Sequence, residues 1–144
     1  MSLPINILLV DDNPGDVRLI QEAFKEIQTK IILQTAKDGQ EALDMMYKKG
    51  DFTNLITPQL IILDLNLPKV DGKDFLRQIK VDQDLKKIPV IVLTTSSSPG
   101  DINDMYQLMA NCYLTKPFDF DEFLEMIKSL EQFWFKLAQL PSIE

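Results

Sequence analysis

Near its start the chain carries a short apolar run that ends in two acidic residues, Ile5-Asn6-Ile7-Leu8-Leu9-Val10-Asp11-Asp12. The run is too short for a core helix, and a nearly uninterrupted apolar stretch of this kind is typical of a strand buried on both faces. Other runs of the same type lie at Leu60 to Leu63, Val90 to Leu93, Cys112 to Leu114 and, more weakly, Ile31 to Ala36. The sequence therefore predicts five buried strands.

Segments with helical spacing of apolar residues separate these runs. They centre on Val17 to Ile27, Ala42 to Tyr47, Phe75 to Ile79, Ile102 to Met109 and Phe120 to Trp134. Helix-start signals precede three of them: Asn13-Pro14, Ser98-Pro99, and Asp119 with Glu122 in a pattern that resembles a capping box. Strands alternating with helices predict a doubly wound α/β domain with a parallel sheet. The one long connection, residues 48–59, is predicted to be an exposed loop.

The length, net charge and residue composition of the chain exclude several classes of function. The chain has 144 residues, the size of one domain, and a net charge of −7, which disfavours direct binding to nucleic acid or to a membrane surface. It has no histidine, so His bases, His ligands and Ser-His-Asp triads are excluded, and the single Cys112 excludes an internal disulfide. No apolar run reaches the roughly 18 to 20 residues of a membrane span, and a cytoplasmic location is predicted.

Polar side chains follow the predicted strands where each strand ends: Asp11-Asp12, Asp64, Thr94-Thr95 and Lys116-Pro117. Ligands of open parallel sheets bind at this edge. If the first and third strands are neighbours, three carboxylates converge there, and a divalent cation would offset their repulsion. An oxygen-only ligand set without His or Cys favours Mg²⁺.

Such a site suits phosphoryl transfer onto a carboxylate, with Lys116 and the Thr94 hydroxyl bonding phosphoryl oxygens. Each residue alone has an ordinary explanation as well. Asp12 can be a helix cap, Thr94 can reflect strand propensity, and a lone lysine usually faces solvent. Their coincidence at four strand ends favours the functional interpretation.

These motifs together resemble the receiver domains of two-component response regulators. The resemblance rests on Ile7 to Asp12, Leu63 to Pro68, Asp71-Gly72, Leu93-Thr94 and Lys116-Pro117-Phe118. It implies a flavodoxin-like five-stranded parallel sheet in the order 2-1-3-4-5. It also divides the chain into a receiver domain at residues 5–130 and a C-terminal helix extension and tail at residues 131–144.

The resemblance further implies a role for each site residue. Asp64 would accept a phosphoryl group from a phosphohistidine on a partner sensor histidine kinase or phosphotransfer protein. Asp12, Asp64 and the Asn66 carbonyl would bind Mg²⁺ directly, and Asp11 would act through a bound water.

Other positions would take part in switching. Thr94 and Tyr113 match the family's switch pair, although Tyr113 could instead be a packed aromatic with its hydroxyl at the surface. Lys116-Pro117 matches a position where the peptide is usually cis, and Gly72 is expected to need backbone freedom.

A finer resemblance, carried by Asn111 to Lys116, Glu131 to Trp134 and Leu140-Pro141, is to single-domain regulators that partner bacterial phytochrome-type kinases. These have an extended final helix. Phe133, Trp134 and Phe135 are consecutive and cannot share one helical face, so at least one is expected at the surface. A homodimer through the last helix is predicted, and the alternative is a tail that folds back onto its own domain.

The sequence thus predicts a stand-alone phosphoacceptor that is not a turnover enzyme, since only autophosphorylation and slow autodephosphorylation are expected of it. One alternative is a Mg²⁺-dependent phosphatase that forms an aspartyl phosphate. Asn66 stands two residues after Asp64, where such an enzyme needs an acid, and an amide cannot donate that proton. The other alternative is a degenerate receiver that only binds partners, against which the complete acidic, hydroxyl and lysine set argues.

Overall fold

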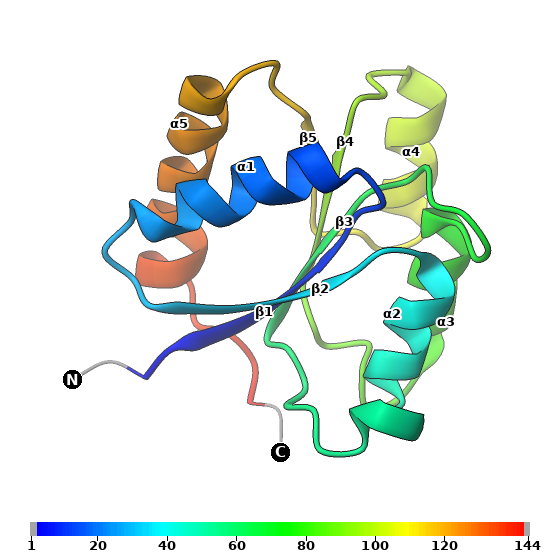
Figure 1. Ribbon diagram of the computed structural model, residues 1–144. Coiled ribbons are helices and arrows are strands. Elements are labelled where there is room, and N and C mark those ends of the chain that lie inside the picture. Colours follow the sequence, from blue (N-terminus) through cyan, green and yellow to red (C-terminus); the bar gives the residue numbers. More distant parts are fainter. Residues whose placement is uncertain (1–2, 143–144) are drawn as a thin grey trace.

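The centre of the computed structural model, which describes residues 3–142, is a five-stranded parallel sheet in the order β2-β1-β3-β4-β5 (Figure 1). The strands are β1 (Ile5–Val10), β2 (Ile31–Ala36), β3 (Leu60–Leu63), β4 (Val90–Thr94) and β5 (Cys112–Thr115). The predicted sheet and its order are confirmed. The prediction that all five strands are buried is wrong for β2 and β5, which are only partly buried because they form the two edges of the sheet. The first three strands have the predicted bounds, and β4 and β5 each continue one residue further.

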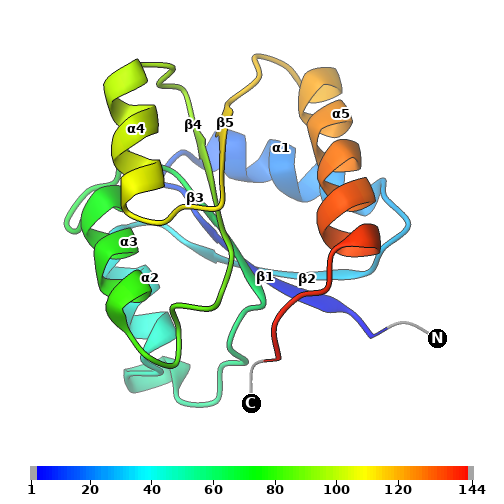
Figure 2. The same ribbon diagram turned by 180° about the vertical axis from the view of Figure 1, so that it is seen from behind.

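Helices cover both faces of the sheet. They are α1 (Pro14–Lys25), α2 (Gly39–Met46), α3 (Gly72–Val81), α4 (Pro99–Gln107) and α5 (Phe120–Leu130). Helices α1 and α5 lie on one face, and α2, α3 and α4 lie on the other (Figures 1 and 2). Because strand side chains alternate, Ile7 and Leu9 pack toward α1 and α5, whereas Leu8 and Val10 pack toward α2 to α4. The fold is the predicted doubly wound, flavodoxin-like α/β domain.

Each of these five helices begins with a side-chain cap. In each case a side-chain oxygen of the cap accepts a hydrogen bond from the backbone N–H three residues further along, at 2.7–3.2 Å. The capping residues are Asn13, Asp38, Asp71, Ser98 and Asp119. Pro14 and Pro99 occupy the first helical position, where no N–H is needed. Replacing one such cap with alanine costs about 1 kcal/mol, so together the caps fix where each helix leaves its strand.

Two helices end two residues earlier than the sequence predicts, and α2 ends one residue earlier, at Met46. Helix α4 ends at Gln107 and not at Met109, because Met109 takes a left-handed φ of 75° and the Ala110 N–H returns to the Met105 carbonyl at 2.9 Å. Helix α1 ends at Lys25, although Ile27 still packs against the core from the following turn.

The long connection at residues 48–59 is less open than predicted. It contains a short 3₁₀ turn, η1 (Gly50–Phe52), and the Phe52 and Leu55 side chains pack against the core.

The final helix is extended, as predicted. Helix α5 continues directly into seven residues of π-helix, η2 (Glu131–Leu137). Leu140, in the tail that follows, packs against the core beneath α1 and α5. The last two residues of the predicted tail, 143 and 144, lie outside the described residues. Among the helices at residues 3–142, none combines the length and apolar character needed to cross a membrane.

Candidate functional site

The carboxyl ends of the strands hold the predicted site residues. Asp11 directly follows β1 and Asp64 directly follows β3, and parallel pairing continues past both strands, since the Asp64 N–H donates to the Val10 carbonyl at 2.9 Å. Lys116 follows β5, and its N–H donates to the Thr94 carbonyl at 2.7 Å. The sheet hydrogen bonds therefore bring residues from distant parts of the chain to one edge.

A buried ion-pair cluster forms at this edge. The Lys116 Nζ lies 2.9 Å from Asp11 Oδ2, 2.9 Å from Asp64 Oδ2 and 2.8 Å from Asp16 Oδ2. The Lys116, Asp11 and Asp64 side chains are only 4%, 1% and 8% exposed. Buried charges of this kind are stable only when they are paired. Here three carboxylates share the single ammonium of Lys116.

The environment shifts the ionisation of the cluster. Burial opposes the charge on Lys116, but the hydrogen bonds from its ammonium to Asp16, Asp64 and Asp11 dominate and raise its pKa. Burial raises the pKa of Asp11 by more than the Asn13 N–H and Lys116 lower it. Because three carboxylates contact one ammonium, the pocket carries formal excess negative charge and favours additional positive charge.

The carboxylates can converge on a cation. One oxygen each from Asp11, Asp12 and Asp64 lie within 4.8 Å of one another, and Asp12 is exposed. This all-oxygen set, open on one side, fits a hard divalent ion that keeps several waters. The Asn66 N–H donates to Asp64 Oδ1 at 3.4 Å, which places Asn66 beside the cluster, and its role as a carbonyl ligand stays a prediction.

Thr94 lies at the end of β4 with its side chain fully buried. Within residues 3–142 its Oγ1 has no hydrogen-bond partner. A buried hydroxyl without a partner is costly, so this atom fits a group that would arrive at the site and accept its hydrogen.

Tyr113 is tied to the loop after β4. Its hydroxyl donates to the Ser96 carbonyl at 2.9 Å, and its ring is partly buried against the core. The Ser96 hydroxyl donates to Asp101 at 2.6 Å, and Lys73 Nζ bridges Asp101 and Asp104 at 3.3 and 3.0 Å. The Tyr113 ring is thus packed against the core, as the alternative expects, and its hydroxyl is bonded to the loop after β4. Its role as a switch residue stays a prediction.

Close packing places the loop after β3. A Cβ on Gly72 would lie 2.5 Å from the Asp64 carbonyl oxygen, and one on Gly39 would lie 1.8 Å from the Val70 carbonyl oxygen. The expectation that Gly72 needs backbone freedom is wrong, because Gly72 is helical and is required for close approach. The left-handed residue in this loop is Lys69, with a φ of 65°.

The peptide before Pro117 also differs from the family pattern. The described peptide bonds are all trans, so the Lys116-Pro117 bond is trans, whereas the family position that it matches is usually cis. For this type of bond the two isomers differ by only about 0.5–1 kcal/mol, and trans is the favoured one.

The predicted interface residues lie on the last helix. Phe133 is 54% exposed, whereas Trp134 and Phe135 pack against the core, the Phe135 ring 6.2 Å from that of Phe24. The expectation that at least one of the three is exposed is confirmed. Two of them support the alternative in which the tail folds back onto its own domain.

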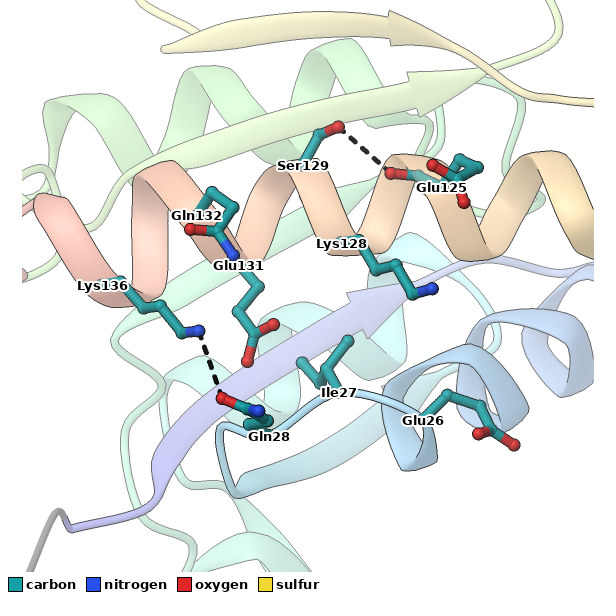
Figure 3. Close-up of a pocket in the computed structure, with 9 residues that line it drawn as sticks. All are labelled: Glu26, Ile27, Gln28, Glu125, Lys128, Ser129, Glu131, Gln132 and Lys136. Atoms are coloured by element: carbon teal, nitrogen blue, oxygen red, sulfur yellow. Dashed lines mark hydrogen bonds between the residues drawn. The ribbon is translucent and has the colours of Figure 1, made fainter.

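A surface pocket lies beside this helix, away from the acidic cluster (Figure 3). It is formed by the turn after α1 and one side of α5 and η2, at the edge where β2 begins. Glu131 is buried here and accepts the Thr29 N–H at 2.8 Å and the Thr29 hydroxyl at 2.7 Å. None of the predicted site residues lines this pocket.

Sequence reasoning missed Asp16 and the Lys73–Asp101–Ser96 chain. Asp16 is in the first turn of α1, where an acidic residue is usual for a helix start and attracts no notice. No spacing in the sequence marks it, because Asp11 and Asp12 lie outside the helix and the position of Asp16 depends on how α1 packs against the sheet.

Comparisons with known proteins agree with this geometry. Residues 7–128 match the response regulator receiver domain family. Response regulator Rcp1 of Synechocystis is 42% identical over 139 residues, which are 96% of this chain and 95% of Rcp1. The probable methanogenesis regulatory protein FilR2 of Methanothrix harundinacea is 39% identical over 91% of this chain and 84% of its own length.

Solved structures give the same result. The phosphorylated cyanobacterial phytochrome response regulator RcpA superposes with a TM-score of 0.92 at 44% identity, covering 97% of this chain and all of its own. The Mn²⁺-bound form of Rcp1 gives 0.90 at 42% identity over 96% of this chain and all of its own. The chain therefore belongs to the response regulator receiver domain family of two-component systems and is related to phytochrome response regulators.

Proposed function

We propose that the protein accepts a phosphoryl group on Asp64 from a phosphohistidine of a partner sensor histidine kinase or phosphotransfer protein. The observation that carries this proposal is the surroundings of Asp64. A buried ammonium lies 2.9 Å from its carboxylate, and two further carboxylates are within reach of a shared cation. The neighbouring strand ends in a buried hydroxyl that has no hydrogen-bond partner among residues 3–142.

The transfer would proceed in line. A carboxylate oxygen of Asp64 forms the new O–P bond while the P–N bond of the donor breaks, and the imidazole leaves with a proton. Lys116 and Thr94 would donate hydrogen bonds to phosphoryl oxygens and so stabilise charge as it moves onto the acceptor.

We assign a Mg²⁺ site to Asp11, Asp12, Asp64 and the Asn66 carbonyl. When bound, the ion supplies positive charge that lets a phosphate dianion approach a carboxylate. The Mn²⁺-bound form of the related Rcp1 supports a divalent ion, as does the excess negative charge of the cluster. Asn66 cannot act as a proton donor, so rapid turnover is not expected and the protein would act as a switch and not as an enzyme.

The switch would run through Thr94 and Tyr113. Drawing the Thr94 hydroxyl toward a phosphoryl oxygen would shift the loop after β4, whose Ser96 carbonyl holds the Tyr113 hydroxyl at 2.9 Å. Loss of that hydrogen bond would free the Tyr113 ring to repack, giving two discrete states.

The partner we propose is a phytochrome-type histidine kinase. Support comes from RcpA, a phytochrome response regulator, and from RPA3017 of R. palustris, a response regulator in red light signalling, which superposes with a TM-score of 0.89 at 32% identity over 97% of this chain and 99% of its own. The cytoplasmic location stays a prediction, as does the domain boundary at residue 130.

We also propose that the protein forms a homodimer through the last helix. Phe133 and Leu137 are 54% and 75% exposed, and they lie four residues apart, on the same side of the helix. Two large apolar side chains at the surface of one element favour a protein contact.

The phosphoacceptor is tested by intact mass after incubation with acetyl phosphate, with and without Mg²⁺. The wild type is expected to gain one phosphoryl group only with Mg²⁺, and Asp64→Asn is expected to gain none. Asp51→Asn, which removes an exposed carboxylate in η1, serves as the matched control and should label like the wild type. Labelling of Asp64→Asn at the wild-type rate would refute the assignment, and no labelling of the wild type would favour a module that only binds partners.

A further inference from the structure

A third carboxylate, outside the predicted site, contacts the lysine of the cluster. Asp16 Oδ2 lies 2.8 Å from Lys116 Nζ, although the two residues are 100 positions apart in the chain. Asp16 is held in place locally, because its N–H donates to the Asn13 cap at 3.0 Å at the start of α1. The contact therefore joins the first turn of α1 to the end of β5.

Three carboxylates crowd the ammonium of Lys116. It donates hydrogen bonds to Asp16 and Asp64 at 2.8 and 2.9 Å and forms an ion pair with Asp11 at 2.9 Å. A phosphoryl oxygen on Asp64 would enter this crowded side of the ammonium, so we expect one of the three carboxylates to give way to it.

Exposure indicates which partner gives way. The Asp11 and Asp64 side chains are 1% and 8% exposed, and both belong to the group whose oxygens lie within 4.8 Å of one another. Asp16 is outside that group and is 24% exposed, so water can solvate its carboxylate when the contact breaks. Releasing Asp16 is therefore the least costly exchange.

We propose that Asp16 is a positioning residue for phosphoryl transfer: it holds Lys116 before phosphorylation and yields its place to a phosphoryl oxygen. This inference rests on the proposed phosphorylation of Asp64. Asp16 competes with the incoming phosphoryl group for the same donor, and it thereby limits how fast and how tightly the site takes up that group.

Removing the charge of Asp16 should affect anions and cations in opposite directions. The four carboxylates and one ammonium of the site carry a formal charge of −3. Asp16→Asn reduces this to −2 and releases a Lys116 donor, so a phosphoryl analogue should bind more tightly and Mg²⁺ more weakly. Loss of a merely structural contact would weaken both.

The test compares wild type, Asp16→Asn and Asp16→Glu for three quantities: Mg²⁺ affinity by calorimetry, affinity for the phosphoryl analogue BeF₃⁻ at saturating Mg²⁺ by NMR, and the labelling rate with acetyl phosphate. Asp16→Asn is expected to raise BeF₃⁻ affinity and labelling rate roughly fivefold, the size of one partly exposed ion pair, and to lower Mg²⁺ affinity roughly twofold. Asp16→Glu restores the charge and should return all three toward wild type.

Glu22→Gln is the matched control, since it removes one exposed carboxylate from the same helix, where Glu22 contacts only Lys25 among the ion pairs of the described residues. It should leave all three quantities unchanged. The proposal is overturned if Asp16→Asn behaves like wild type, or if it weakens BeF₃⁻ and Mg²⁺ together. A wild type that neither labels nor binds BeF₃⁻ would instead refute the proposed function itself, which separates the two failures.

Discussion

The Thr94 hydroxyl is buried without a hydrogen-bond partner within residues 3–142, at the end of a strand that is otherwise entirely apolar and buried. Leaving such a group unpaired costs about 1–3 kcal/mol, and valine has nearly the same shape without the hydroxyl. A threonine here lowers stability, and residues that do so are concentrated at functional sites.

Thr94→Val is therefore expected to separate stability from function. The free energy of unfolding should rise by about 1 kcal/mol, because an unpaired polar group is removed and valine favours strands. Affinity for BeF₃⁻ should fall, because the donor is lost. Urea denaturation and NMR titration measure the two effects.

Thr95→Val is the natural control for Thr94→Val, since the neighbouring Thr95 is exposed. It should leave BeF₃⁻ affinity unchanged. If Thr94→Val were less stable than wild type, the Thr94 hydroxyl would have a hydrogen-bond partner in solution, which would contradict the structure.

At the level of single residues, sequence predicted the members of the site that follow strands and missed the member on a helix. Asp11, Asp64 and Lys116 end apolar runs, so topology alone brings them together. Asp16 depends on the tilt of α1 against the sheet, which follows from packing of helix and core, and no spacing rule contains that angle.

At the level of elements, Glu131 connects the last helix to the turn before β2. Burial would raise the pKa of its carboxyl, but hydrogen bonds from the Thr29 hydroxyl and N–H outweigh burial and lower it. A lowered pKa means that the unfolded chain binds the proton more tightly, so this carboxylate contributes stability above its unfolded pKa of about 4.3 and loses it as pH falls through the folded pKa.

Glu131→Gln is expected to lower the free energy of unfolding by about 1 kcal/mol at neutral pH, because charged hydrogen bonds to Thr29 become neutral ones. The difference from wild type should shrink as the pH falls below about 4, where the wild-type carboxyl is protonated. Urea unfolding of both proteins across the acidic range measures this. Glu125→Gln, at an exposed position of α5, should show no such trend, and a constant gap for Glu131→Gln would contradict the role of its charge.

Strands were easier to predict than helix ends. The central strands β3 and β4 are buried, nearly continuous apolar runs, so composition marks their limits. The end of α4 depends on the left-handed turn at Met109, a residue type that seldom adopts it, and the π-helical η2 keeps the apolar spacing of an ordinary helix in sequence. Neither feature leaves a sequence signal.

At the level of the whole molecule, the net charge opposes association of two copies, whereas the exposed end of the last helix favours it. Each chain carries −7, so two copies repel, whereas Phe133 and Leu137 offer apolar surface to a partner.

Dimerisation should therefore strengthen with salt, because screening removes repulsion and leaves apolar contact. Light scattering at low and high ionic strength should show more dimer at high salt for the wild type, and Phe133→Ser should remain monomeric in both. Tyr106→Ser, which removes an exposed aromatic on α4, is the control and should dimerise normally. A Phe133→Ser dimer as stable as wild type would exclude this helix as the interface.

The position of Lys116 in the chain has a consequence for how the protein is made. Three carboxylates that share its ammonium, at residues 11, 16 and 64, leave the ribosome long before it does. Domains fold as units once their chain has emerged, and until β5 docks, the nascent sheet edge carries these charges with no internal cation. The acidic pocket therefore closes late in biosynthesis. A chain that stops before β5 keeps all the carboxylates of the pocket but lacks the Lys116 ammonium that holds them together.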